Sequence, residues 1–157
     1  MILIIKSIKT KMLKNYKGKY FSIEELCHSD TADRLGIVNE PTYTQLVAMR
    51  RLIDKVLDPV RELYGAPIYI NSGFRCEALN KAVKGASTSQ HKKGEAADID
   101  TKKGQAENMR LYNMIIRSEI DYDQLINEDP DKNGQPNWIH ISYRLDETQR
   151  HTHFTLN

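Results

Sequence analysis

The sequence predicts an α+β fold in which helices flank a mostly antiparallel sheet. Short segments with the alternation of strands lie between helical patterns, and a turn at 129–134 joins the last two predicted strands as a hairpin. With 157 residues, of which 39% are hydrophobic and 28% charged, the chain can form one globular domain with its own core. We therefore expect a single domain over residues 20–145, between a flexible basic lead at 1–19 and a tail at 146–157.

The N-terminal lead carries the excess positive charge of the chain. The first 20 residues contain six lysines and no acidic residue, which leaves 17 basic and 21 acidic residues, a net charge of −4, for the remainder. Domains that bind nucleic acid are basic, so we expect no nucleic-acid partner. A protein that bound nucleic acid through the lead alone would lose this binding when residues 1–19 are deleted.

The apolar stretch 1–5 is short and precedes its lysines, unlike a secretory signal, and no segment is long enough to span a bilayer. We expect a monomer that is made in the cytoplasm and does not insert into membranes.

The helices and strands follow from the periodicity of the apolar residues. Phe21 precedes a short helix, with Ser22 as its N-cap and Glu25 completing a capping box. A longer helix is predicted over 42–64, where apolar residues recur at three- and four-residue steps and Pro59 is expected to introduce a kink. The remaining patterns predict strands at 68–70, 95–101, 123–127 and 137–143 and helices at 77–83 and 105–118.

The residues that best indicate chemistry are His91, Asp98 and His140. Two histidines and one carboxylate are the ligand types of a catalytic zinc that keeps a further coordination position for water. In both predicted strands the polar residue alternates with apolar ones, so Asp98 and His140 share one face of the sheet if the strands pair, and His91 can reach that face from the preceding loop. Taken singly, each residue has an ordinary explanation: a surface histidine, a capping or paired aspartate, and a core histidine with its hydrogen bonds satisfied.

Four other residues of metal-ligating type have simpler explanations. Cys27 and Cys76 are far apart in the chain, and two cysteines do not make a disulfide framework, so we expect both to be reduced. Cys76 as a further metal ligand is a weaker alternative. His151 and His153 form a His-x-His pair, but no strand pattern surrounds them, so we expect them in a mobile terminus.

Five short motifs occur along the chain in a fixed order. They are Ser72-Gly-Phe-Arg75, Leu79-Asn80, Ser89-x-His91-x-x-Gly94-x-Ala96-x-Asp98-Ile99, Asp123-Gln-Leu-Ile126-x-Glu128 and Trp138-x-His140-x-Ser142. Together they resemble the M15 family of zinc peptidases, and most of all its small D-alanyl-D-alanine carboxypeptidase-like and phage endolysin-like members. The resemblance covers about residues 21–143 and implies the zinc-binding α+β fold that these enzymes share with the signalling domain of hedgehog proteins.

The resemblance also implies roles for individual residues. His91, Asp98 and His140 match the family's ligands for one zinc ion per chain. Arg75 matches an arginine that engages the substrate and the developing oxyanion, a task that suits a permanently charged guanidinium, with a structural salt bridge as its alternative role. Ser89 matches a serine that shapes the loop or contacts the substrate.

The general base is where the sequence departs from the family pattern. Many members carry Asp or Glu three residues before the second histidine ligand, whereas this chain has Asn137, whose amide cannot accept a proton from water. Glu128 is the nearest candidate, because it ends the neighbouring strand and can reach across the hairpin. Asp123, Asp129 and Asp131 are weaker alternatives in turn-like or solvated settings.

The motifs and the resemblance predict a zinc metallopeptidase that hydrolyses stem peptides of bacterial peptidoglycan. Its expected reaction is that of a D-alanyl-D-alanine carboxypeptidase or an L-alanyl-D-glutamate endopeptidase. The lack of an export signal agrees with phage- or prophage-type release to the cell wall. The alternative, which Asn137 favours, is a catalytically silent zinc module that binds wall peptides or a protein partner.

Overall fold

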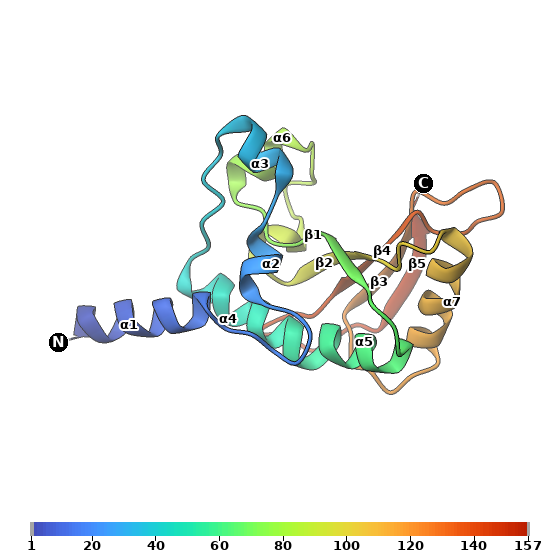
Figure 1. Cartoon of the computed structure of the whole chain (residues 1–157), viewed down its shortest axis with the longest axis horizontal. Helices are drawn as coiled ribbons and strands as arrows, with labels where there is room; N and C mark the ends of the chain where they lie inside the picture. The colour runs from blue at the N-terminus through green and yellow to red at the C-terminus, as the bar shows by residue number, and fades with distance from the viewer. Residues whose placement is uncertain (1, 157) are drawn as a thin grey trace.

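The computed structural model describes residues 2–156, which form a five-stranded sheet with helices packed against one of its faces (Figure 1). Neighbouring strands are antiparallel, except that β3 and β5 are parallel, so the predicted α+β class with a mostly antiparallel sheet is confirmed. In their spatial order the strands are β1 (Tyr69–Ser72), β2 (Ala96–Asp100), β4 (Trp138–Ser142), β3 (Gln124–Glu128) and β5 (Thr152–Leu156).

The helical elements include those expected from the apolar periodicity and several short ones. They are α1 (Ile2–Lys14), α2 (Ile23–Cys27), α3 (Asp30–Leu35), α4 (Tyr43–Leu52), α5 (Asp58–Tyr64), α6 (Glu77–Ala82), α7 (Gln105–Ile116), the π-helical segment η1 (Ile53–Leu57) and the 3₁₀ turn η2 (Gln90–Lys93). Ser22 caps α2 by accepting a hydrogen bond from the Glu25 backbone N–H at 3.1 Å, as its position predicts. Among the described residues, none of these helices combines the length and the apolar character needed to cross a lipid bilayer.

The long helix predicted over 42–64 is present, but it changes geometry in the middle. Helix α4 passes into η1, where the Asp58 backbone N–H donates to the carbonyl oxygen of Ile53, five residues back, and α5 then begins with Pro59 in its first turn. Proline has no N–H to donate and its ring crowds the preceding turn, so the wider π segment accommodates it. The irregularity expected from Pro59 therefore takes the form of a π segment.

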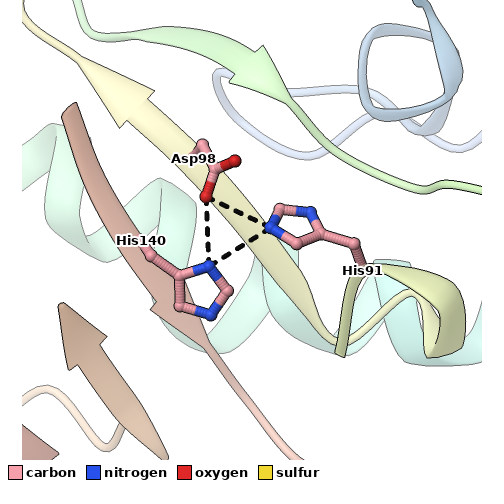
Figure 2. Close-up of side chains that lie close together, drawn as sticks. All are labelled: His91, Asp98 and His140. Atoms are coloured by element: carbon pink, nitrogen blue, oxygen red, sulfur yellow. Dashed lines mark hydrogen bonds and ion pairs between the residues drawn. The ribbon is translucent and has the colours of Figure 1, made fainter. Parts of the chain in front are cut away.

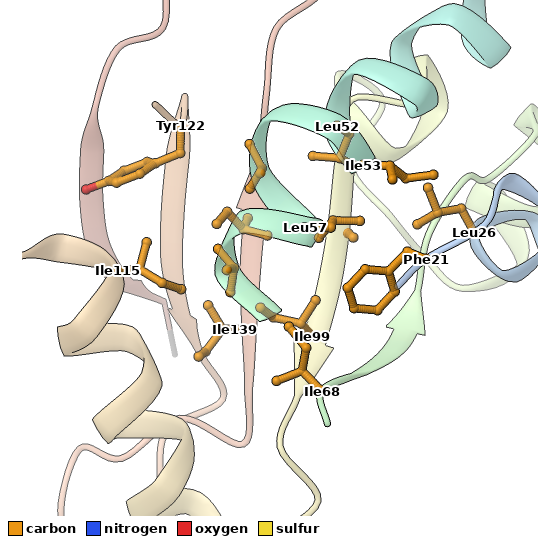
Figure 3. Close-up of a cluster of buried hydrophobic side chains, with 14 of the residues drawn as sticks. Phe21, Leu26, Leu52, Ile53, Leu57, Ile68, Ile99, Ile115, Tyr122 and Ile139 are labelled. Atoms are coloured by element: carbon orange, nitrogen blue, oxygen red, sulfur yellow. The ribbon is translucent and has the colours of Figure 1, made fainter. Parts of the chain in front are cut away.

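The core lies between this long helix, α7 and one face of the sheet (Figure 3). Ile99 of β2 faces Ile139 of β4 in the strand register, and both side chains are fully buried in this core. Because side chains alternate along a strand, the residues next to them, Asp98 and His140, point to the opposite face. The helices thus cover the apolar face and leave the polar face available for a site.

The lead and the tail contain elements that the apolar periodicity does not predict. Helix α1 occupies most of the lead, and Leu13, in its last turn, packs against the core. The lysines of segment 1–19 are the reason to expect a flexible lead, but two of them form ion pairs with acidic residues, Lys14 with Glu40 and Lys19 with Glu62. These contacts across the chain have no local pattern in the sequence, so the lead differs in structure from the expectation.

The tail differs from the expectation in the same way. Strand β5 pairs with β3 over its whole length, which places His153 in the sheet and His151 immediately before it. The His151 ring nitrogen Nε2 lies 2.9 Å from Asp121 Oδ1. The expectation of a mobile His-x-His terminus is therefore not met, because backbone pairing with β3 supplies the order that the side-chain pattern does not indicate.

Candidate metal centre

The central pair of strands, β2 and β4, brings two of the three predicted ligands together. Asp98 and His140 are direct partners in the antiparallel register, and both are buried at 7% exposure. Residues directly opposite in an antiparallel pair have their Cβ atoms about 5 Å apart, so the sheet itself sets their separation. The prediction that alternation places them on a common face is confirmed.

The third predicted ligand, His91, comes from the turn η2. Its Nδ1 lies 2.7 Å from the carbonyl oxygen of Gly73, which can only accept, so Nδ1 carries the hydrogen and Nε2 keeps its lone pair. The His91 carbonyl oxygen in turn accepts from the Arg75 backbone N–H at 3.1 Å. The segment 73–75 therefore fixes both the position and the tautomer of His91, as partners of metal-ligating histidines commonly do.

The three side chains converge on one point (Figure 2). The separations are 3.1 Å from His91 Nε2 to Asp98 Oδ1, 3.0 Å from His140 Nδ1 to Asp98 Oδ1, and 3.2 Å between the two ring nitrogens. Ligands about 2.0–2.1 Å from a tetrahedral zinc lie about 3.3 Å apart, so these three atoms nearly match one face of such a tetrahedron. The three residues are a buried His-Asp-His group that can bind a metal ion, and its donor types fit zinc.

The second oxygen of Asp98 binds Arg75. Arg75 Nη2 donates to Asp98 Oδ2 at 3.0 Å, and its Nε donates to Ser72 Oγ at 2.9 Å. Burial opposes ionisation of Asp98, but the adjacent His91 and His140 hold the pKa of its carboxyl far below the ordinary value. Arg75 thus makes the salt bridge that was its alternative role, and this salt bridge leaves Asp98 Oδ1 directed at the histidines.

An open cleft of about 530 Å³ lies over the His-Asp-His group. Arg75 and Ser89, the predicted substrate-contacting residues, both line it. Glu128 lines it as well, and it is the only carboxylate among the described lining residues besides Asp98. Burial, followed by the charge of Asp98, raises the pKa of Glu128 above the usual glutamate value. The cleft therefore combines a potential metal centre with a carboxylate that is a stronger base than an ordinary glutamate.

The other acidic candidates and Asn137 do not line this cleft. Asp123 is fully buried and binds Arg150. Asp129 accepts from the exposed Asn137 side chain at 3.1 Å, and Asp131 accepts from backbone N–H groups of its own turn. Among the acids considered as a base, only Glu128 shares the cleft with the His-Asp-His group.

Apolar residues also line the cleft, and the sequence motifs contain two of them, Ile126 and Trp138, without assigning them a role. Leu156 of β5 lines the cleft as well. Alternation could have identified the first two, because Ile126 is two residues from Glu128 and Trp138 two residues from His140. Leu156 could not have been identified in this way, because β5 itself was not predicted.

Two further features bear on metal binding elsewhere in the chain. Cys27 and Cys76 are free thiols, as expected, and neither belongs to a ligand group among the described residues. His28, Asp30 and Asp33 form a second cluster of ligand type, but all three are exposed on the surface. The buried group in the cleft is therefore the candidate metal centre.

Comparison with known proteins agrees with this geometry. No curated protein matches the chain. The family model described as peptidase M15 matches residues 19–142, which include the His-Asp-His group, Arg75 and Glu128. Peptidases of this family are generally zinc-dependent. Because the match covers most of the chain, this protein belongs to the peptidase M15 family.

Proposed function

We propose that this protein is a zinc metallopeptidase that hydrolyses stem peptides of bacterial peptidoglycan. One observation carries the proposal: three donor atoms separated by 3.0–3.2 Å lie in an open cleft that also contains Glu128. Family membership supports peptide hydrolysis. The substrate class rests on the motif resemblance, which favours a D-alanyl-D-alanine carboxypeptidase or an L-alanyl-D-glutamate endopeptidase acting at the bacterial cell wall.

His91, Asp98 and His140 would hold the zinc ion in this enzyme. When bound, zinc supplies Lewis acidity that polarises the scissile carbonyl and makes water a better nucleophile near neutral pH. Glu128 accepts the proton of the attacking water as the C–O bond forms and then delivers it to the leaving amine, so that the C–N bond breaks. Arg75 holds Asp98 in place and presents positive charge to the carbonyl oxygen as negative charge develops there. Ser89 contacts the substrate from the loop before His91.

The test compares the zinc-loaded parent with a Glu128→Gln variant on purified stem peptides, with mass spectrometry of the products. Glutamine keeps the size of the side chain and cannot accept the proton, so we expect turnover to fall by at least about 100-fold while zinc remains bound. Glu119→Gln, on an exposed glutamate, is the matched control and should keep full turnover. A new fragment from the parent identifies the bond that is cut.

A catalytically silent zinc module is the second candidate function. Asn137 favours it, because this position is commonly acidic in the family and the side chain here does not line the cleft. The same experiment separates the two. If parent and Glu128→Gln both bind zinc and neither releases a fragment, the peptidase proposal is wrong and the silent module remains.

A further inference from the structure

A fully buried carboxylate, Asp123, joins the last strand of the sheet to the metal centre. Its Oδ1 accepts from Arg150 Nε at 2.9 Å and its Oδ2 from Arg150 Nη2 at 2.6 Å. Gln90 Nε2 donates to the same Oδ2 at 3.0 Å, and Gln90 directly precedes the ligand His91. One carboxylate thus contacts both the segment that precedes β5 and the turn that carries His91.

The same contact sets the position of β5. Asp123 Oδ1 also accepts from the Arg150 backbone N–H at 3.0 Å, and the Asp123 carbonyl oxygen accepts from the Thr152 backbone N–H at 3.1 Å. Starting from this anchor, β5 runs parallel to β3 in a register that places Leu156 beside Glu128. The Leu156 carbonyl oxygen then accepts from the Asp129 backbone N–H at 3.1 Å. Strand β5 is therefore fixed at both of its ends.

Leu156 contributes to the wall of the cleft at that point. It lines the cleft together with Ile126 and Trp138, and about half of its side chain is exposed. These three residues form an apolar wall next to Glu128, whereas Arg75 and Lys84 give the cleft two cationic lining residues. A substrate side chain that lies along the apolar wall would be selected by its size and its hydrophobicity.

We propose that Leu156 is a specificity-determining residue of the cleft and that Arg150, through Asp123, is the positioning residue that seats it. The segment that supplies both residues follows the part of the chain matched by the family model, which ends at residue 142. The inference rests on the proposed function in so far as the cleft binds stem peptides. Beyond that function, we infer that β5 sets which substrate side chain the enzyme prefers next to the scissile bond.

The test measures kcat/KM for synthetic stem peptides that carry glycine or leucine next to the scissile bond, in two series, one for each side of the bond. In the series whose varied side chain lies against Leu156, Leu156→Ala should reduce the preference for leucine over glycine by about 10-fold. The other series should be unaffected. Arg150→Gln should change the leucine preference in the same direction, because the two side-chain hydrogen bonds to Asp123 that help to seat β5 are lost while its backbone pairing with β3 remains. Phe154→Ala is the matched control: Phe154 lies in the same strand and is similarly exposed, but it does not line the cleft, so the preference should stay unchanged.

Binding provides a second readout that does not need turnover. Trp138 is the only tryptophan of the chain and lines the cleft, so its fluorescence can report peptide binding in the Glu128→Gln background. We expect the leucine peptide to lose affinity when Leu156→Ala is added and to keep it when Phe154→Ala is added. If Arg150→Gln lowers the melting temperature too far to be used, the Leu156 and Phe154 variants decide alone.

The outcomes separate the inference from the proposed function. Turnover with the same leucine preference in the parent, Leu156→Ala and Phe154→Ala would overturn the inference and leave the peptidase intact. Peptide binding that depends on Leu156, without turnover by the parent, would support the inference and overturn the peptidase. Equal loss of binding in the Leu156 and Phe154 variants would overturn the inference, because it would reflect a general disturbance of β5.

Discussion

Gly73 orients a residue of the candidate metal centre although it has no side chain of its own. Its carbonyl oxygen accepts the His91 Nδ1 hydrogen bond at 2.7 Å. A Cβ at this position would lie 2.2 Å from the Leu26 carbonyl oxygen, closer than any real contact. That carbonyl oxygen accepts from the Phe74 backbone N–H at 2.7 Å, so the end of α2 packs directly on the segment that orients His91. The glycine is required by this close approach of two backbones.

Replacing Gly73 with alanine should weaken metal binding. The added methyl group must push the Gly73 carbonyl away from His91, and the loss of such a partner typically costs 10- to 100-fold in metal affinity. Competition with a chromophoric chelator measures the zinc affinity directly. Gly36→Ala is the control: its φ of +64° makes alanine strained there too, but nothing lies within 4 Å of the added Cβ. Equal zinc affinities in the two variants would contradict this role of Gly73.

At the scale of elements, Asp123 acts as a junction between β3, β5 and the turn η2. Burial alone would raise the pKa of Asp123, but the hydrogen bonds from Arg150, together with that from Gln90, lower it below the ordinary aspartate value. A group with a lowered folded-state pKa stabilises the fold above its unfolded pKa of about 4, and this stabilisation is lost as the pH falls through the folded-state pKa. Part of the acid sensitivity of the fold should therefore come from this junction.

The change Asp123→Asn should lower the free energy of unfolding by about 2 kcal/mol at pH 7, because it leaves Arg150 without its buried partner. We take a value below the range for a fully buried pair, since about half of the Arg150 side chain is exposed. The difference between parent and variant should shrink as the pH falls below about 4, where the aspartate of the unfolded parent takes up a proton, and should vanish as the pH falls through the lowered pKa of Asp123 in the folded parent. Urea unfolding at several pH values measures this, with the exposed Asp146→Asn as the control. A difference that does not change with pH would contradict the ionic role of Asp123.

The elements that sequence patterns predict are those with apolar periodicity of their own. The strand residues Ile99 and Ile139 alternate with polar neighbours, and the helix that ends near Tyr64 has a continuous apolar stripe. Strand β5 has no fully buried side chain, and its order comes from pairing with β3 and from Arg150, which binds a residue 27 positions earlier. Helix α3 is an exception, because it was not predicted although the sequence contains local signals for it. These signals are the N-cap Ser29 and the left-handed Gly36 at its C-terminal end.

At the scale of the whole molecule, the candidate metal centre joins parts of the chain that are distant in sequence. The ligand-type residues span 49 positions, from the turn η2 to the central strand β4. A metal ion bound by all three would therefore stabilise the folded chain and not the unfolded one. The expected gain is about 4 kcal/mol when free zinc is present at 1,000 times its dissociation constant.

Zinc should accordingly raise the melting temperature of the metal-free protein, and a chelator should reverse the rise. Magnesium should have little effect, because it prefers six oxygen ligands over imidazole nitrogens. Differential scanning calorimetry with each ion measures the shift. The variant His140→Ala should lose the response, whereas His28→Ala, at the exposed cluster, should keep it. A zinc response that persists in His140→Ala would contradict the assignment of the centre.

The site itself is predictable from the sequence to the extent that its residues lie in recognisable strands or motifs. Asp98 and His140 follow from alternation, and Glu128 is identified as a cleft residue because it ends the strand that pairs with the one carrying His140. The bridge from Arg75 to Asp98 connects the segment after β1 with the middle of β2, and only the pairing of these two strands reveals it. The contribution of Leu156 depends in turn on the pairing of β5.

The direct pairing of Asp98 with His140 has a consequence for how the sheet is assembled. If β4 slipped by one residue against β2, an isoleucine would stand in the place of His140 and a polar side chain would enter the core. Such a misaligned sheet would offer two donors where the aligned sheet offers three. A zinc ion would therefore favour the correct strand register, because it binds the aligned sheet more tightly than the misaligned one.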